Sequence, residues 1–243
     1  MAINHNIHIH HKPIRVLNSK YVNLRSDSGR LSDDDEVITK HSAANLVRKL
    51  RNSNHQIVLW AVEELRTLGC LSDGTLSWIC LRYANLQEAD LCAADLNNVD
   101  LHKANLEMAD LSHANLNGAR LTRARMQSSN LEKATLDGAS LVRANMQGAN
   151  VSYEQLATAG RMRGSVLPDG NLYDGRFNLR GDFVDASILH VDLNNPRAIA
   201  AFFGVSLEDF LLGQEWRREQ MSSTSVWHKD VCFQNAEVKM NWL

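Results

Sequence analysis

The residues of this 243-residue chain that could do chemistry begin with four histidines near its start: His5, His8, His10 and His11. Neutral imidazoles at such short spacing can chelate a divalent metal ion, but no carboxylate accompanies them to complete a site. Because they lie in a terminus without any periodicity, we interpret them as at most an adventitious metal binder. The sequence therefore predicts neither a metal site nor a cofactor.

Carboxylates and cysteines show no catalytic pattern either. Four aspartates in the middle of the chain each precede a leucine: Asp90, Asp95, Asp100 and Asp110. Polar residues at such positions are typical of solvated turns, where their side chains bond to nearby backbone amides. The four cysteines lack a CxxC spacing, and the chain has no phosphate-binding glycine-rich loop and no HExxH or GxSxG motif. We therefore predict that the protein is not an enzyme.

The composition is that of an ordinary water-soluble protein, with 44% hydrophobic residues, 22% charged residues and a formal net charge of −2. No apolar run approaches the roughly 20 residues that cross a bilayer, and the N-terminus lacks the apolar core of a signal peptide. A cytoplasmic location without membrane contact is therefore expected. Aromatic residues make up only 6% of the chain, so small and aliphatic side chains must fill most of the interior.

The elements that position these residues follow from a repeat of five residues, which runs from Leu76 to Val151 without interruption. All sixteen central positions of the repeat are apolar, and alanine occupies twelve of the sixteen positions two residues earlier. A period of five matches neither the 3.6-residue turn of a helix nor the two-residue alternation of a strand. The sequence therefore predicts a coil that turns a corner at each repeat and points its leucines and alanines toward a shared axis.

This A-(D/N)-L-x-x pattern resembles the pentapeptide-repeat family. The resemblance implies a mainly β fold, a right-handed quadrilateral β-helix, here of about four turns. The segments Glu154-Gln155-Leu156 and Leu167-Pro168-Asp169-Gly170 also resemble the exit segment of many bacterial members. Within that stretch the apolar series falters, because Arg161 stands where an apolar residue is due, and we expect the coil to end near there in a helical turn.

The flanks of the repeat carry helix signals, so we predict α-helices on both sides of the coil. Asn54 and Gly69 can cap and close a helix before the repeat, and Asn195-Pro196 can begin one after it. The predicted division is a flexible, His-containing tail over 1–31, a helical cap over 32–75, the β-helix over 76–165, a turn and irregular exit segment over 166–194, a C-terminal helical pair over 195–220 and a tail over 221–243.

The predicted C-terminal helices are too apolar to be left in water. Their large side chains are Phe202, Phe203, Phe210, Leu211 and Trp216. These residues must cover either the C-terminal end of the coil or the same helices of another subunit, and the sequence leaves both alternatives open. A homodimer through these helices is one of the two.

Charge placement on the coil predicts one basic side, because residues twenty apart stack on the same side if four repeats make a turn. The predicted interaction face consists of Arg82, His102, Lys103, Arg120, Arg123 and Arg143. Like charges at the strand spacing of about 4.8 Å repel one another, but exposure and long stems relax that cost. The alternatives are a merely solvated side and a docking face for an anionic partner.

Taken together, the residues favour a non-enzymatic scaffold, a rigid prism that docks a protein partner through outward-facing residues or through the C-terminal helices. Some members of the family that this chain resembles mimic duplex DNA and modulate DNA gyrase. Against that role, sixteen repeats give only roughly 19 Å of coil, and the repeat region is neutral overall. A third alternative, weak binding of anions or nucleic acid by the basic side, has little aromatic interleaving to support it.

Overall fold

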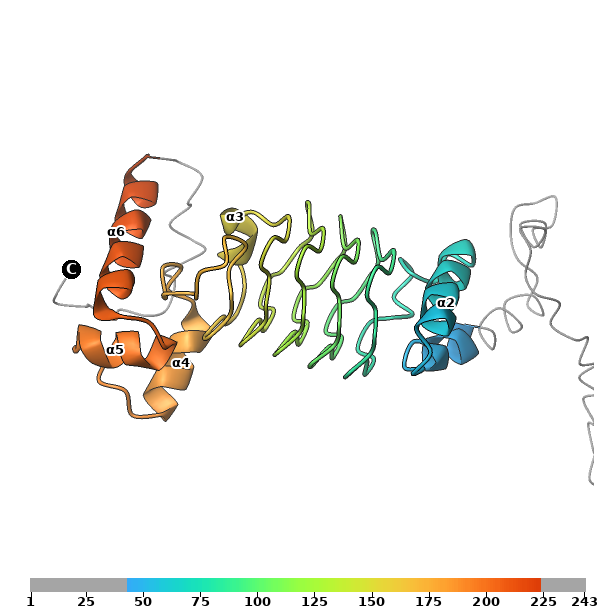
Figure 1. Cartoon of the computed structure of the whole chain (residues 1–243), viewed down its shortest axis with the longest axis horizontal. Helices are drawn as coiled ribbons and strands as arrows, with labels where there is room; N and C mark the ends of the chain where they lie inside the picture. The colour runs from blue at the N-terminus through green and yellow to red at the C-terminus, as the bar shows by residue number, and fades with distance from the viewer. Residues whose placement is uncertain (1–42, 224–243) are drawn as a thin grey trace, which may run out of the picture.

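The computed structural model describes residues 43–223 and shows an elongated molecule in which a central coil joins two helical ends (Figure 1). The predicted N-terminal tail, with its four histidines, lies outside these residues, as does most of the predicted C-terminal tail. The described helices are α2 (His55–Thr67), α3 (Tyr153–Leu156), α4 (Arg180–Ile188), α5 (Pro196–Phe203) and α6 (Leu207–Ser223), and residues 43–49 are also helical. No helix among the described residues has the length and apolar character needed to cross a membrane.

Each five-residue repeat turns a corner through the same hydrogen-bonded turn. In the repeat that begins at Leu81, the Ala84 N–H donates to the Leu81 carbonyl oxygen at 3.1 Å. Tyr83, at the third position of this turn, has a φ of 61°, and the equivalent residue of every repeat from Trp78 to Gly148 also has a positive φ. A type II β-turn requires such a third residue. The chain therefore changes direction after every five residues, which gives the coil its four sides.

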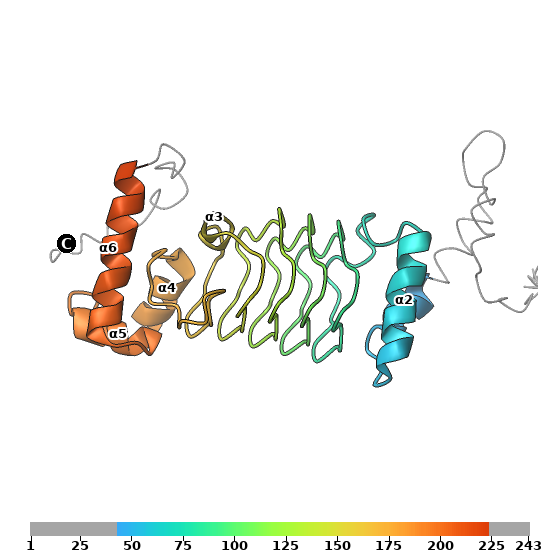
Figure 2. The same cartoon turned by 45° about the horizontal axis from the view of Figure 1, so that its top comes forward.

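Successive turns of the coil are joined by parallel bridges between single residues twenty positions apart, as the stacked turns in Figure 2 show. Asn85 pairs with Asn105, and Asn105 pairs in turn with Arg125. The Leu86 N–H donates to the Asn105 carbonyl oxygen at 2.7 Å. The sequence predicts a mainly β chain, whereas the described coil contains isolated bridges in place of extended strands. The reason is that the chain turns again before a strand can lengthen.

Leucine and alanine side chains fill the axis of the coil. All fifteen central residues from Leu76 to Met146 are 0 or 1% exposed, and the alanines two residues before them are also buried. Val151, the last residue of the series, is only half-buried. Each buried Leu side chain contributes roughly 1.5–3 kcal/mol relative to an exposed one. Nothing in this core depends on the outward residues, so the surface of the coil can vary without disturbing it.

The coil does not end at Arg161, as the faltering apolar series predicts, but continues with its period shifted by one residue. Arg161 takes the bridge position and pairs with Ser140, a separation of 21 residues. Met162, the next residue, occupies the core position and is 0% exposed, as is Leu167 five residues later. The shift follows helix α3, which replaces one corner of the coil and adds one residue to that turn.

Helix α2 lies across the first turn of the coil (Figure 1). Asn54 caps it by accepting a hydrogen bond from the Gln56 N–H at 3.0 Å. Val58 and Leu65 on one face of the helix are fully buried. The Arg66 guanidinium reaches the coil and bonds to the carbonyl and the carboxylate oxygens of Asp90. The apolar end of the coil is thereby covered within the chain, as an exposed sheet edge requires.

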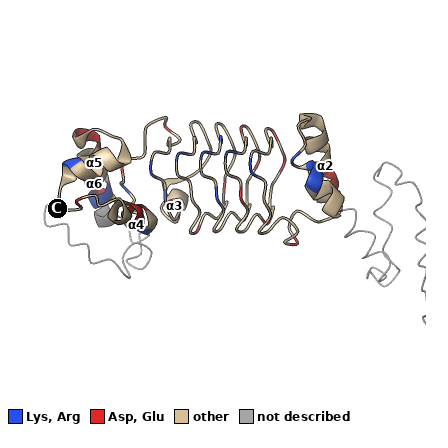
Figure 3. Cartoon of the chain, turned by 90° about the horizontal axis from the view of Figure 1, so that it is seen from below, with Lys and Arg blue, Asp and Glu red and all other residues tan. Residues whose placement is uncertain are grey.

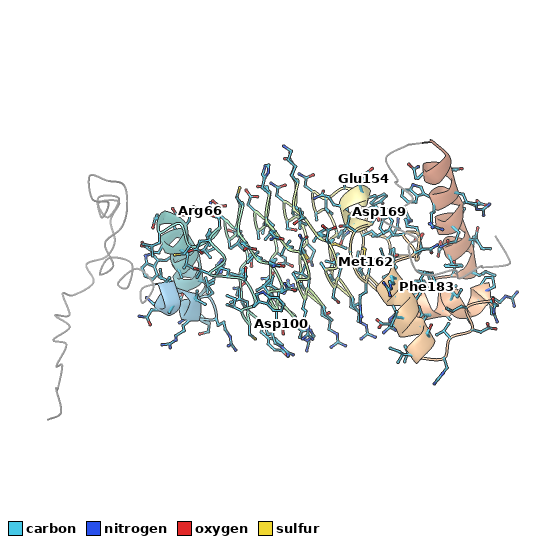
Figure 4. The ribbon with its side chains drawn as sticks, turned by 180° about the vertical axis from the view of Figure 1, so that it is seen from behind. Arg66, Asp100, Glu154, Met162, Asp169 and Phe183 are labelled. Atoms are coloured by element: carbon cyan, nitrogen blue, oxygen red, sulfur yellow. The ribbon has the colours of Figure 1, made fainter. Side chains whose placement is uncertain are left out.

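Helix α4 closes the opposite end of the coil, within the segment that the sequence predicts to be irregular. Its buried Asp182 carboxylate accepts hydrogen bonds at 3.1 Å from the backbone N–H groups of Met162 and Arg163, and Met162 lies where the coil meets this helix (Figure 4). The Gly181 N–H donates to the Gly160 carbonyl oxygen at 3.0 Å. These bonds replace those that a further turn would have made. The exit segment is therefore a specific cap, which the sequence prediction of an irregular segment missed.

An aromatic cluster attaches α5 and α6 to this end of the coil. The ring of Tyr173 stacks on Phe177 at a centroid distance of 5.5 Å and meets Phe203 of α5 edge-on at 5.6 Å. Phe203 in turn stacks on Phe210 of α6 at 6.4 Å, and Trp216 meets Phe177 at 5.9 Å. Aromatic pairs at such distances add roughly 0.5–1.5 kcal/mol each beyond the area that they bury. The C-terminal helices therefore form a packed cap on the coil.

Replacing Gly138 tests whether the third turn position requires a residue that tolerates a positive φ. Gly138 has a φ of 69°, and a Cβ atom added there would meet nothing within 4 Å. We expect Gly138→Val to lower the free energy of unfolding by about 1–2 kcal/mol, because a β-branched residue is disfavoured at positive φ. Gly138→Asn should cost well under about 1 kcal/mol, since Asn tolerates this conformation. Chemical denaturation measures both values, and equal losses would contradict this assignment.

The Asp182 cap predicts a dependence of stability on pH. Burial raises the pKa of Asp182 to about 7, against the opposing hydrogen bonds from Met162 and Arg163, whereas the pKa in the unfolded chain is about 3.9. Between these values the folded protein keeps a proton that the unfolded chain has lost, so the free energy of unfolding should fall as pH rises from about 4 to about 7. The full difference corresponds to roughly 4 kcal/mol.

Asp182→Asn is the matched variant for this dependence, because an amide does not titrate. The wild-type unfolding free energy minus that of the variant should decline over the same pH range, which cancels the titration of all other groups. A direct measurement by ¹³C NMR of the Asp182 carboxyl carbon avoids reliance on the stability of the variant. A midpoint near 4 in that titration, or parallel stability curves, would refute the assignment.

Candidate interaction surface

The structure places the basic residues predicted from the sequence on one side of the coil, at the turns. Lys103, Arg123 and Arg143 occupy the third turn position in three successive turns, with φ values of 57°, 60° and 58°. The Lys103 N–H donates to the Thr122 carbonyl oxygen at 3.0 Å, and the Arg123 N–H to the Val142 carbonyl oxygen at 2.9 Å. The three side chains are exposed. They form a straight row along the coil, which we call the cation row.

The other predicted residues of this side lie around the cation row. Arg82 and His102 occupy the second turn position, next to the row, and His102 is half-buried. Arg120 lies at the bridge position opposite Asp100, and its guanidinium is 3.8 Å from that carboxylate. Five of the six predicted residues therefore lie together with exposed or half-buried side chains. The sixth, Arg120, lies at the edge of this group and pairs with Asp100.

Two residues of this surface are missing from the sequence prediction. Arg163 lies on the turn after Arg143, whose N–H donates to the Arg163 carbonyl oxygen at 3.0 Å. It stands twenty residues after Arg143, but the sequence prediction follows the repeat only to Val151. The one-residue shift at α3 places Arg163 at the second turn position and Gly164, with a φ of 70°, at the third. Tyr83 lies one turn before Lys103 in the same column and is 62% exposed. Its spacing from Lys103 is visible in the sequence, but a survey of charged residues alone passes over it.

We call the whole surface the basic face, and Figure 3 shows Lys and Arg recurring on successive turns of the coil. It comprises Arg82, Tyr83, His102, Lys103, Arg123, Arg143 and Arg163. The exposed Tyr83 ring lies 5.3 Å from the Lys103 Nζ atom and 5.9 Å from the Arg82 guanidinium carbon. At the other end, the Arg163 guanidinium carbon lies 4.8 Å from the Phe202 ring of α5. Cation–π contacts therefore bound the basic face at both ends.

The bases of the basic face, the cation row with Arg82 and Arg163, differ from the other bases of the described coil in having no ion-pair partner. Within residues 43–223, no carboxylate lies within 4.0 Å of Lys103, Arg123 or Arg143. The other bases of the coil that have such partners form the pairs Arg120–Asp100, Arg125–Glu107, Lys133–Glu132 and Arg161–Asp185. Positive charge without an ion-pair partner is therefore concentrated on this one face of the described coil, with the cation row at its centre.

The surroundings of His102 on the basic face lower its pKa. Partial burial lowers the pKa of His102, and the charges of Arg82 and Lys103 lower it further, while Asp100 opposes them. A histidine whose pKa lies below its ordinary value of about 6.5 is neutral at pH 7. His102 therefore contributes an aromatic, uncharged side chain beside Tyr83, with which it makes an edge-on contact at 6.0 Å.

A cavity of about 430 Å³ lies between the end of the coil and α4, in the region where a catalytic pocket would be sought. Its lining comprises Gly138, Ala157, Thr158, Ala159, Gly160, Arg161, Phe177, Asn178, Leu179, Arg180, Gly181 and Val184. That lining contains no His, Cys, Ser, Asp or Glu, so it offers no general base and no activated nucleophile. Across the described residues, no group of three or more His, Cys, Asp or Glu side chains could hold a metal ion.

The hydrophobic residues that the sequence assigns to a cap or a dimer surface divide into two sets. Phe203 and Phe210 are 2% and 1% exposed within this single chain, because they belong to the aromatic cluster. Phe202 and Trp216 are half-buried, and Leu211 is 39% exposed. The first set covers the end of the coil and is unavailable to a second subunit in this arrangement.

Comparison with known proteins supports the coil and little beyond it. The family model described as pentapeptide repeats matches eight copies, over residues 79–118 and 119–152. No curated protein matches the chain. Among solved structures, a pentapeptide-repeat protein of the Arabidopsis thaliana thylakoid lumen is 25% identical, over 42% of this chain and 72% of that chain, with a TM-score of 0.36.

Two further solved structures resemble parts of the chain. HetL of Nostoc sp. strain PCC 7120, a pentapeptide-repeat protein involved in the regulation of heterocyst differentiation, is 29% identical over 40% of this chain and 61% of that chain, with a TM-score of 0.17. QnrB1, a plasmid-mediated fluoroquinolone resistance protein, is 15% identical over 37% of this chain and 68% of that chain, with a TM-score of 0.22. Scores this low say nothing about what this chain binds.

The match to the family model agrees with the repeats that the structure shows. Eight matched copies coincide with the part of the chain in which every corner has the same turn and every turn pairs with the next. Such repeats imply a right-handed β-helix. Residues 79–152 are therefore pentapeptide repeats.

Proposed function

We propose that the protein is a non-enzymatic scaffold that docks an acidic protein partner on its basic face. The observation that carries this proposal is the cation row, in which Lys103, Arg123 and Arg143 stack on successive turns without any carboxylate within 4.0 Å among residues 43–223. Four bases elsewhere on the coil, Arg120, Arg125, Lys133 and Arg161, lie within 4.0 Å of an acid, so the geometry of the coil permits such pairing. An anionic partner would supply the compensating charge that the row lacks.

Rigidity makes this surface suitable for docking. The backbone of each cation is fixed by a hydrogen bond to the next turn, 3.0 Å long at Lys103 and 2.9 Å at Arg123. A partner therefore orders only the side-chain stems, and the backbone loses no further freedom on binding. Each exposed ion pair adds about 0.2–1 kcal/mol, so the row sets orientation and association rate more than affinity.

The alternatives fit the surface less well. Modulation of DNA gyrase by DNA mimicry requires an acidic surface like that of duplex DNA, whereas this face is basic. The C-terminal helices are the other docking surface that the sequence favours, but Phe203 and Phe210 are buried in the chain's own core. Catalysis in the cavity beside α4 lacks a His, Cys, Ser, Asp or Glu side chain in the lining.

The proposal predicts that reversing the charge of the cation row abolishes partner capture. A crosslinked pull-down from nuclease-treated native lysate compares the wild type with the triple variant Lys103→Glu, Arg123→Glu, Arg143→Glu. The matched control is Arg51→Glu, Arg180→Glu, Arg197→Glu, which makes the same change in net charge at exposed positions away from the basic face. We expect the wild type and the control to recover one protein, and the row variant to lose it at least about tenfold, or roughly 1.4 kcal/mol.

Two results would contradict the proposal. Equal recovery by all three proteins would show that the cation row is merely solvated and would direct attention to the C-terminal helices. Recovery of no protein by the wild type would overturn the scaffold role itself. Thermal unfolding of each variant confirms that the coil is intact, which the buried core makes the expected result, since none of the six positions contributes to it.

A further inference from the structure

We infer that the partner presents an α-helix with an acidic stripe, lying along the axis of the coil on the basic face. This inference rests on the proposed function, because it specifies the partner of the same surface. Three features carry it: the spacing of the bases, their straight alignment and the aromatic contacts at the two ends. Each favours a helix over the other anionic partners that a protein surface can meet.

The spacing of the cation row is closer to that of a helix than to that of a strand. Consecutive turns are backbone-bonded, so Lys103, Arg123 and Arg143 follow one another at about 4.8 Å. Acids at i, i+4, i+7 and i+11 on one face of a helix recur about every 5.4 Å along its axis. Alternate residues on one face of an extended strand recur every 6.4–6.8 Å or so.

The difference in spacing between a helix and a strand grows over the distance from Lys103 to Arg163. From Lys103 to Arg163 there are three turn-to-turn steps, or about 14 Å. Three helical steps cover about 16 Å, and three two-residue steps of a strand cover about 20 Å. Flexible Lys and Arg stems can absorb 2 Å or so over this distance, whereas 6 Å or so would pull the end pairs apart. Arg163 stands one residue to the side of the row, at the second turn position, and Gly164 takes the row position on that turn. A helix can therefore reach the three bases of the row and the flanking Arg163 together, whereas a strand can reach only two or three of the four.

The straightness of the row distinguishes a protein helix from duplex nucleic acid. Phosphates on one DNA strand rise about 3.4 Å per residue, but the strand winds fully around the duplex in about ten base pairs. The straight cation row of three bases therefore loses contact with that strand after a few phosphates. An acidic stripe on a helix stays on one face for as long as the spacing of its residues is kept.

The aromatic side chains at the ends indicate what flanks the acidic stripe. Tyr83 is 62% exposed and lies one turn before Lys103, beside the uncharged His102 ring. Phe202 is half-buried and packs against Arg163 at the other end. An apolar residue one helical turn before the acidic stripe would bury the Tyr83 ring, which supplies the hydrophobic contact that exposed ion pairs cannot.

Synthetic helices test the inference with the full-length protein. The probe is an 18-residue alanine-based peptide, held helical by a lactam bridge on its far side, with glutamates at i, i+4, i+7 and i+11. A second peptide has the same bridge and composition but one glutamate every five residues, so that the acids wind around the helix. A third is held extended by prolines and carries four glutamates, and a single-stranded oligonucleotide of equal charge completes the set.

Fluorescence anisotropy at low ionic strength measures the binding of each probe. We expect the striped helix to bind at least about fivefold more tightly than the other three probes, a difference of roughly 1 kcal/mol. The triple variant of the cation row should lose at least that factor for the striped helix, while the Arg51, Arg180 and Arg197 control should not. Tyr83→Ala should weaken only a striped helix that carries a leucine at i−4.

Each of the other outcomes overturns the inference of a helical partner. The proposed function is tested separately, by the pull-down. Equal binding of the striped and scattered helices, or tighter binding of the extended peptide, would exclude the helical geometry, while row-dependent capture in the pull-down would still support an acidic protein partner. Tightest binding of the oligonucleotide would assign the face to nucleic acid. A striped helix that binds the row variant as well as the wild type would place the contact elsewhere on the protein.

Discussion

The pairing of each backbone turn with the next is the constraint on which the rest of the structure depends. A five-residue turn cannot satisfy its own amides, so the Leu86 N–H must find the Asn105 carbonyl oxygen, and so on along the coil. The two ends then need partners from elsewhere. At the exit, the Gln155 side chain donates to the Leu131 and Ala134 carbonyl oxygens at 2.8 Å, and Asp182 accepts from the last turn. Side chains thus complete a hydrogen-bond pattern that the backbone leaves open.

The same pairing separates the surface of the coil from its core. The axis is filled mainly by Leu and Ala, with a few residues such as Met126 and Val99, and most outward side chains lie beside those of neighbouring turns. Because the twenty-residue register is fixed, each outward side chain has two defined neighbours. Asp100 and Arg120 show what this register allows, since an acid and a base twenty residues apart lie within 4 Å. Any pattern of charge can therefore be placed on the coil at little cost to folding.

The sequence predicts the regular part of the molecule well, because a period of five residues corresponds directly to one corner of the coil. It fails where side chains replace the repeat. The helical corner at α3 adds one residue, which moves Arg161 out of the core position and Arg163 out of the cation row. Asp182 carries no signal of burial, because its partners are backbone N–H groups twenty residues earlier in the chain. The basic face was predictable from spacing, whereas its aromatic boundary at Tyr83 depends on a residue type that a survey of charge omits.

The coil could accommodate other residues at the positions of the cation row. An acid in place of Arg123 would have lain beside Lys103 and Arg143 at the spacing of the Asp100–Arg120 pair, with no change to the core. Three like charges at about 4.8 Å repel one another, and exposure reduces that cost without removing it. A ligand that binds only the folded coil and neutralises the row would recover this energy and stabilise the coil by mass action. The unpaired row is therefore the feature of the coil that its own folding explains least, and it is the feature on which the proposal of an acidic partner rests.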